Sequence, residues 1–218
     1  MKYDIITFGS ATRDVFLISE KLAGREGLCL NPGSKVNIDN LLLKLGGGGI
    51  NTATAFSNQG FKTAFCGMIG NDRDGDDIVK ELIHSKIDTG LLRKTAAKPT
   101  NYSLIIASPG FDRTILAYRG AAGEMGKKDI PWNKLDAKWF YLSPLSGKIC
   151  NLTLNLVEFA KKNKIKVAFN PGQSQLAFPV KVLEAILRKV DILILNQEEA
   201  SFLTKIPYRN ENKIFKKL

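Results

Sequence analysis

Four glycines and an asparagine stand together at residues 46–51, where the chain reads Gly-Gly-Gly-Gly-Ile-Asn. Four consecutive glycines favour a tight turn in which the backbone approaches another group closely. The small residues of 52–59 then predict a helix that ends at Gly60. A glycine turn that opens a helix presents unpaired N–H groups and the positive end of the helix dipole. The segment therefore predicts a site for a polar or anionic ligand, with a flexible turn that binds nothing as the alternative.

A second glycine-rich segment, residues 67–75, reads Gly-Met-Ile-Gly-Asn-Asp-Arg-Asp-Gly. It follows a predicted strand at 61–66 and precedes an amphipathic helical pattern. The apolar positions of that pattern are Ile78, Val79, Leu82 and Ile83. The aspartates at 72, 74, 76 and 77 predict a capped helix start that complements the dipole. A calcium loop of the EF-hand type is excluded, because Gly75 is misplaced and no glutamate closes the loop.

Two other glycine-loop sites are excluded by spacing. The chain holds no Gly-x-x-x-x-Gly-Lys-Ser/Thr, so a P-loop nucleotide site is excluded. The dinucleotide fingerprint that would begin at Gly46 and Gly48 needs a glycine at position 51, where this chain has Asn51.

Together the two segments resemble the first signature of the ribokinase-like carbohydrate kinases, the PfkB family. Further motifs of that family follow in the same order along the chain. They are Gly9-Ser10 with Asp14, Asn170-Pro171-Gly172, and the Asn-x-x-Glu of 196–199. Five motifs in order make the resemblance specific, and it extends over nearly the whole chain. It implies ATP-dependent transfer of a phosphoryl group to an alcohol, with Mg²⁺ and ATP as cofactors.

The resemblance also implies a set of substrate-binding residues. They are Asp14, Gly46, Gly47, Gly49, Asn51 and Arg119. In this interpretation Asp14 accepts hydrogen bonds from sugar hydroxyls, Asn51 both donates and accepts, and the glycines bring backbone N–H groups to the sugar. Gly48 stands where relatives often carry a larger or charged residue, so the pocket wall differs here. For Arg119, a surface salt bridge remains an equal alternative.

Asn196 and Glu199 are the residues that the resemblance assigns to Mg²⁺ and phosphate. They follow a predicted strand and open a helix, at the ligand edge of an open α/β sheet. Without the resemblance, Glu198 and Glu199 are simply acidic residues of a first helical turn.

The family's Gly-Ala-Gly-Asp motif, which supplies the catalytic base, occurs nowhere in the 218 residues. We therefore expect a C-terminally truncated kinase without a catalytic residue of its own, inactive alone. The substrate of the complete protein is expected to be a small sugar. Two alternatives stay open: an adenosine-type nucleoside kinase, because Asn170-Pro171-Gly172 departs from the Asp-x-Asn form of sugar kinases, and a non-catalytic sugar-binding or interaction module.

The alternation of apolar elements predicts an α/β fold, a Rossmann-like, mostly parallel sheet with helices on both faces. Strands are predicted at 3–9, 61–66, 139–142, 166–169 and 191–195, and helices through 149–159 and 182–187. The last two strands are continuous apolar runs, typical of strands buried on both faces. We expect one domain, 1–218, with an inserted β lid. Its strands are predicted near 12–18, 35–38, 101–108 and 113–119.

Charge and residue composition limit the classes of partner that we expect for this chain. The net charge is +11, but the lysines are dispersed and the densest run, 161–166, falls at a predicted helix end, so we expect no nucleic-acid partner. No signal peptide or membrane span is recognisable, which predicts a cytoplasmic protein without a membrane partner. Cys29, Cys66 and Cys150 lack metal-ligand spacing and are expected to be reduced. A homodimer through the lid or an exposed sheet edge is a further expectation.

Overall fold

The architecture is described from a computed structural model of the chain, in which residues 2–24, 27–28 and 31–218 are described. A parallel sheet in the order β13-β12-β11-β1-β6 forms its centre. The strands are β1 (Tyr3–Phe8), β6 (Thr63–Cys66), β11 (Ala137–Leu142), β12 (Lys166–Phe169) and β13 (Ile192–Leu193). The α/β fold with a mostly parallel sheet is thus confirmed, as are the four strands predicted before residue 170.

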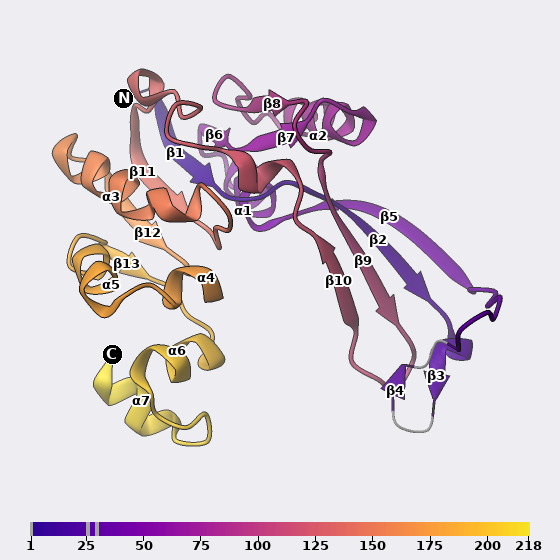
Figure 1. Cartoon of the computed structure of the whole chain (residues 1–218). Helices are drawn as coiled ribbons and strands as arrows, with labels where there is room; N and C mark the ends of the chain where they lie inside the picture. Colours follow the sequence, from indigo (N-terminus) through magenta and orange to yellow (C-terminus); the bar gives the residue numbers. More distant parts are fainter. Residues whose placement is uncertain (1, 25–26, 29–30) are drawn as a thin grey trace.

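Helices cover both faces of this sheet (Figure 1). The helices of the described chain are α1 (Gly48–Asn58), α2 (Arg73–His84), α3 (Thr153–Lys162), α4 (Gln173–Leu176) and α5 (Val180–Leu187), with α6 (Gln197–Thr204) and α7 (Glu211–Lys217) packed against each other beyond β13. One buried cluster joins the sheet to α3 and α5 through Phe140, Leu156 and Ile186. A second cluster joins it to α1 and α2 through Phe65 and Ile78. The helix predicted through 149–159 begins instead with a 3-10 turn, Cys150–Leu152, before α3.

Four strands form a second sheet that extends away from the body (Figure 1). They are β2 (Thr12–Ile18), β5 (Asn40–Gly46), β9 (Asn101–Ala107) and β10 (Thr114–Tyr118), in the order β10-β9-β2-β5. We call this sheet the lid. Two short pairs accompany it: β3 (Ala23–Gly24) with β4 (Gly27–Leu28), and β7 (Met68–Gly70) with β8 (Arg93–Thr95). The β9–β10 hairpin turns at Gly110, which has a positive φ of 83°, as its sequence predicts.

The lid strand predicted at 35–38 is wrong: those residues have no regular structure, and the strand is β5. β5 pairs with β2 along its whole length, from Asn40 opposite Ile18 to Gly46 opposite Thr12. The continuous leucines of 41–43 lack the alternation of a half-buried strand, and they are exposed on the lid. Pairing with β2, rather than a local pattern, therefore determines where this strand lies.

The last strand also differs from its prediction. Only Ile192 and Leu193 pair with β12, and β13 is the edge of the sheet. Ile192 and Ile194 are 46% and 39% exposed, so this strand is not buried on both faces. Its apolar character is therefore not explained by contacts among the described residues.

Candidate functional site

A small cavity of about 210 Å³ lies where the lid joins the sheet. It is lined by Ser10, Thr12, Asp14, Gly47, Asn101, Tyr102, Ser103, Ala117, Tyr118 and Arg119. The chain enters it directly after β1 ends at Phe8, at the carboxyl edge of the parallel sheet. That edge is where open α/β sheets hold ligands. Three predicted residues, Asp14, Gly47 and Arg119, thus meet at one cavity.

Asp14 lies on β2 beside Gly46, and the two fit together closely. A Cβ added to Gly46 would lie 1.9 Å from Asp14 Oδ2, so only glycine leaves the carboxylate this position. Asp14 pairs in register with Ser103 of β9. Burial raises the pKa of Asp14 above its ordinary value, while a hydrogen bond from Ser103 lowers it. The result is a half-buried carboxylate at the wall of a polar cavity, suited to accept hydrogen bonds.

Gly47 makes the turn between β5 and α1. Its φ is 99°, a conformation that L side chains rarely adopt, and a Cβ would lie 2.5 Å from the Ser10 carbonyl oxygen. The turn is shorter than four consecutive glycines suggest, because Gly46 ends β5 and Gly48 already begins α1. The backbone of Gly47 therefore forms part of the cavity wall, at the N-terminus of a helix.

Gly49 has a packing role in place of the expected ligand contact. Its N–H donates to the Ser10 carbonyl oxygen at 3.0 Å and is thus already used within the protein. A Cβ would lie 2.5 Å from Phe65 Cε2, which means that glycine lets α1 approach the sheet. Thr7 Oγ1 donates to the Gly49 carbonyl at 3.1 Å and holds the same contact from β1.

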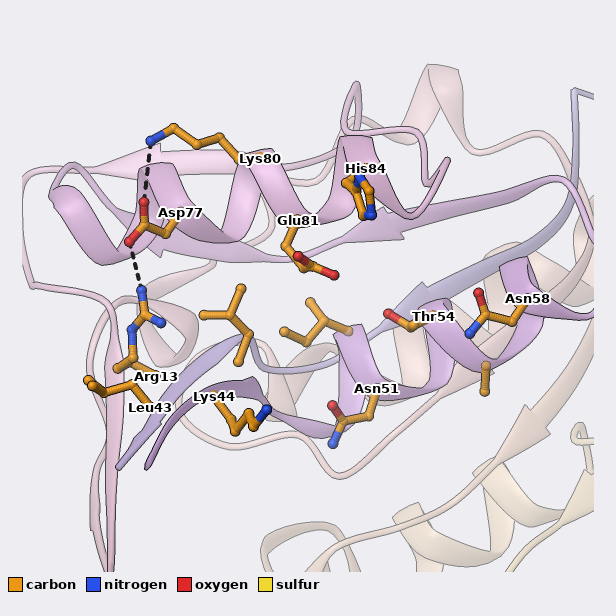
Figure 2. Close-up of a pocket in the computed structure, with 13 residues that line it drawn as sticks. Arg13, Leu43, Lys44, Asn51, Thr54, Asn58, Asp77, Lys80, Glu81 and His84 are labelled. Carbon is orange, nitrogen blue, oxygen red and sulfur yellow. Dashed lines mark hydrogen bonds and ion pairs between the residues drawn. The ribbon is translucent and has the colours of Figure 1, made fainter. Parts of the chain in front are cut away.

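Asn51 lies at a different cavity from Asp14. It lines an open groove of about 950 Å³ between α1, α2 and the root of β5. Figure 2 shows Asn51 on the first turn of α1, with Lys44 beside it and Arg13 and Asp77 farther along the groove. Asn51 therefore does not line the small cavity with Asp14, although its N–H donates to the Gly47 carbonyl oxygen at 3.0 Å.

Three polar residues of the small cavity were missed at the sequence level: Thr12, Asn101 and Ser103. Asn101 is 5% exposed, and its Oδ1 accepts a hydrogen bond from Ala122 N at 3.0 Å. That bond orients the side-chain amide and leaves Nδ2 as a donor. The available signal was spacing, since Thr12 and Asp14, like Asn101 and Ser103, are two apart and share one face of a strand.

Asn196 and Glu199 form a reciprocal capping box at the start of α6. Asn196 Oδ1 accepts from Glu199 N at 2.8 Å, and Glu199 Oε2 accepts from Asn196 N at 3.0 Å. They follow β13 at the same carboxyl edge as the cavity. Two strands lie between β13 and β1, which corresponds to roughly 14 Å along the edge at about 4.8 Å per strand. One carboxylate oxygen of Glu199 is left outside the capping box.

The acidic residues after β7 cap α2, as predicted. Asp72 is the N-cap and accepts from Gly75 N at 2.8 Å.

Among the described residues, no three His, Cys, Asp or Glu side chains are grouped to hold a metal ion. Cys66 and Cys150 are buried and unpaired, whereas Cys29 lies outside the described residues. In the part of the chain that the structure describes, no helix has the length and apolar character to cross a membrane.

Comparison with known proteins decides the family. The description that matches residues 2–218 is pfkB family carbohydrate kinase. The chain belongs to this family. A ribokinase of Staphylococcus aureus (strain COL) is 29% identical over 97% of this chain and 66% of its own length. The solved structure of Sa239 has a TM-score of 0.82 at 26% identity, covering 99% of this chain and 68% of that one.

The fold has a further match in the structure of Arabidopsis thaliana ribokinase complexed with ribose and ATP. The TM-score is 0.79 at 20% identity, over 100% of this family member and 67% of that chain. This likeness shows the ribokinase-type fold. The chain spans about two thirds or less of the length of these curated relatives, which include a second ribokinase and a bifunctional ribokinase/ribose-5-phosphate isomerase A.

Proposed function

We propose that this pfkB-family chain binds a small sugar in the 210 Å³ cavity, for phosphorylation of a sugar hydroxyl by ATP. The observation that carries the proposal is the cavity lining, in which hydroxyl, amide and carboxylate groups of Ser10, Asp14 and Asn101 converge at the lid root. Such groups match the alternating donors and acceptors of a sugar. The cavity holds roughly seven water volumes at about 30 Å³ each, which suits a monosaccharide.

In this proposal Asp14 accepts hydrogen bonds from sugar hydroxyls and fixes which hydroxyl points toward the sheet edge. The lid excludes water, which would otherwise compete for the phosphoryl group. Arg119 and the backbone of Gly47, which both line the cavity, supply donors. ATP supplies the phosphoryl group, and the resemblance assigns deprotonation of the hydroxyl to a Gly-Ala-Gly-Asp aspartate that these 218 residues do not contain. We therefore propose that the 218 residues alone have little kinase activity.

Asn196 and Glu199, at the start of α6, fit a minor role in binding Mg²⁺. Oε2 of Glu199 accepts the capping hydrogen bond, so the other carboxylate oxygen of Glu199 is outside the capping box. Oδ1 of Asn196 already accepts a hydrogen bond from Glu199 N. Mg²⁺ keeps much of its water and binds proteins through one or two carboxylates together with substrate phosphates. Glu199 is thus the residue that we propose would hold the ion, and a bound ion would neutralise phosphate charge.

The test is calorimetry of the 218-residue chain with D-ribose, 2-deoxy-D-ribose, D-fructose and cytidine. Relatives named ribokinase, deoxyribokinase and cytidine kinase motivate the choice. We expect a pentose to bind, and Asp14→Ala to weaken it by about 1–3 kcal/mol. Preference for cytidine would favour the nucleoside alternative. Binding of none of the four would refute the proposal and favour an interaction module.

A coupled assay with ATP, Mg²⁺ and the best-binding sugar tests the activity of the chain alone. Loss of a general base costs about a hundred- to ten-thousand-fold. Turnover at an ordinary kinase rate would therefore contradict the proposed inactivity. Because ATP is an intracellular phosphoryl donor, we also propose a cytoplasmic location.

The lid is the surface that we propose for self-association. Leu41 and Leu43 of β5 and Leu116 and Tyr118 of β10 are all about half exposed, at alternate positions of the two outer strands of the lid. Exposed apolar side chains gathered on a sheet in this way mark a surface suited to a protein partner. We expect Leu43→Asp to shift sedimentation from dimer to monomer. The matched control is Ile83→Asp, an exposed apolar position on α2.

A further inference from the structure

Arg13 precedes Asp14 on β2, and successive strand residues point to opposite faces. Asp14 faces the small cavity, whereas Arg13 faces α2 of the body. Arg13 Nε donates to Asp74 Oδ1 at 2.7 Å, and Nη2 donates to Asp77 Oδ2 at 2.9 Å. One guanidinium therefore connects the root of the lid to two carboxylates on the first turns of one helix.

Arg13 is the member of this ion pair that is shielded from water. The side chain of Arg13 is 12% exposed, against 36% for Asp74 and 38% for Asp77. Figure 2 shows Arg13 reaching from the lid to Asp77, with Lys80 on the other side of the same carboxylate. The planar guanidinium of arginine directs its N–H donors at two carboxylates at once. A lysine ammonium carries the same charge but does not fix the direction of its donors in this way.

A second connection joins the same end of α2 to the neighbouring lid strand. Asp72 accepts hydrogen bonds from Thr100 N and Thr100 Oγ1, both at 2.7 Å. Thr100 directly precedes Asn101, the first residue of β9 and a lining residue of the cavity. The first turns of α2 thus hold both central strands of the lid, each one residue away from a cavity side chain.

We propose that Arg13 is a positioning residue, which through Asp74 and Asp77 sets the angle of the lid root and thereby places Asp14 on the sugar. The inference rests on the proposed sugar site. Removal of the guanidinium breaks the direct contact between β2 and α2 and leaves two neighbouring carboxylates that repel each other. Because Arg13 is not at the cavity, its effect on the sugar must pass through the position of Asp14.

The experiment compares the wild-type 218-residue chain with Arg13→Gln, Arg13→Lys and a control, Lys94→Gln. Lys94 pairs with Asp76 on the same turn of α2, but it comes from β8 and does not reach the lid. D-ribose affinity is measured by calorimetry, and amide hydrogen exchange is measured across β2 and β9. We expect Arg13→Gln to weaken ribose binding by about tenfold and to speed exchange at the lid root, with Lys94→Gln like the wild type.

Arg13→Lys separates positioning from general stability. We expect its affinity between those of wild type and Arg13→Gln, because lysine keeps the charge but cannot hold both carboxylates. Ribose affinity within twofold of wild type in Arg13→Gln would overturn the inference, as would unchanged exchange in β2 and β9. If the wild type itself binds no sugar, the proposed function has failed, and faster exchange in Arg13→Gln would still support the anchor between the lid and α2.

Discussion

Gly46→Ala is a one-carbon change that should remove sugar binding while leaving the fold in place. The added Cβ would lie 1.9 Å from Asp14 Oδ2, and 2.8 Å from Asp14 Cγ. The nearest atoms are the end of a flexible side chain, so the carboxylate can turn away at small cost to stability. Asp14 then no longer faces the cavity. Losing hydrogen bonds to a charged group costs about 1.5–3 kcal/mol, which corresponds to roughly 10- to 150-fold in Kd.

Gly48→Ala is the matched control for this prediction. Its Cβ would lie 3.2 Å from Ser143, and it is the first residue of α1, where alanine is favourable. Calorimetry with D-ribose and a thermal melt should be run on both variants. We expect Gly46→Ala to lose affinity with a melting temperature close to wild type, and Gly48→Ala to bind within about threefold. Equal ribose affinity in Gly46→Ala and wild type would show that Asp14 does not hold the sugar.

Four further predictions concern Asp14, Glu124, Gly49 and Ile192. Burial raises the pKa of Asp14, so its carboxylate should become protonated, and ribose affinity should fall, at a higher pH than an ordinary aspartate would give. Because the raised pKa means that burial of the charged form is unfavourable, Asp14→Asn should stabilise the fold at neutral pH. Hydrogen bonds from Lys148 and Lys98 lower the pKa of Glu124 from 4.5 to about 2. The stabilising contribution of Glu124 should therefore be fully present above pH 4.5 and be lost as the pH falls from 4.5 to about 2. Glu124→Gln should make the free energy of unfolding less dependent on pH in this range. Gly49→Ala should destabilise by about 1–3 kcal/mol in urea through overpacking, whereas Gly126→Ala, with its nearest contact at 3.5 Å, should not. Ile192→Lys should reduce self-association in sedimentation if the exposed sheet edge mediates it, and a monodisperse wild-type monomer would contradict that edge contact.

Much of the fold was predictable because its strands are locally marked. Continuous apolar runs between helical patterns identified β1, β11 and β12, and Asp72 identified the start of α2. β5 was not predictable in this way, because its leucines are exposed and its limits depend on pairing with β2. β13 was predicted too long for a related reason: an apolar run shows that burial is favourable, but the neighbouring elements decide whether it occurs.

The candidate site was predictable where a residue's role depends on its own conformation. Gly47 belongs to a glycine run that predicts a tight turn, and it has a positive φ in the structure, whereas Asp14 was predicted from the family motif that it forms with Gly9-Ser10. Asn51 and Gly49 were harder, because their roles depend on which way the first turn of α1 faces. The structure turns Asn51 to the large groove and uses the Gly49 N–H internally.

The two halves of the cavity are held by different parts of the molecule. The Gly47 turn is fixed to the body, since Gly49 N donates to the Ser10 carbonyl at 3.0 Å and Gly49 packs closely on Gly9, just after β1. Asp14 instead belongs to the lid, whose root is tied to α2 by Arg13. A sugar that contacts both walls therefore senses the position of the lid relative to the sheet. Substitutions that loosen the lid root should thus weaken binding more than they lower the stability of the core, and those that disturb the Gly49 contact should do the reverse.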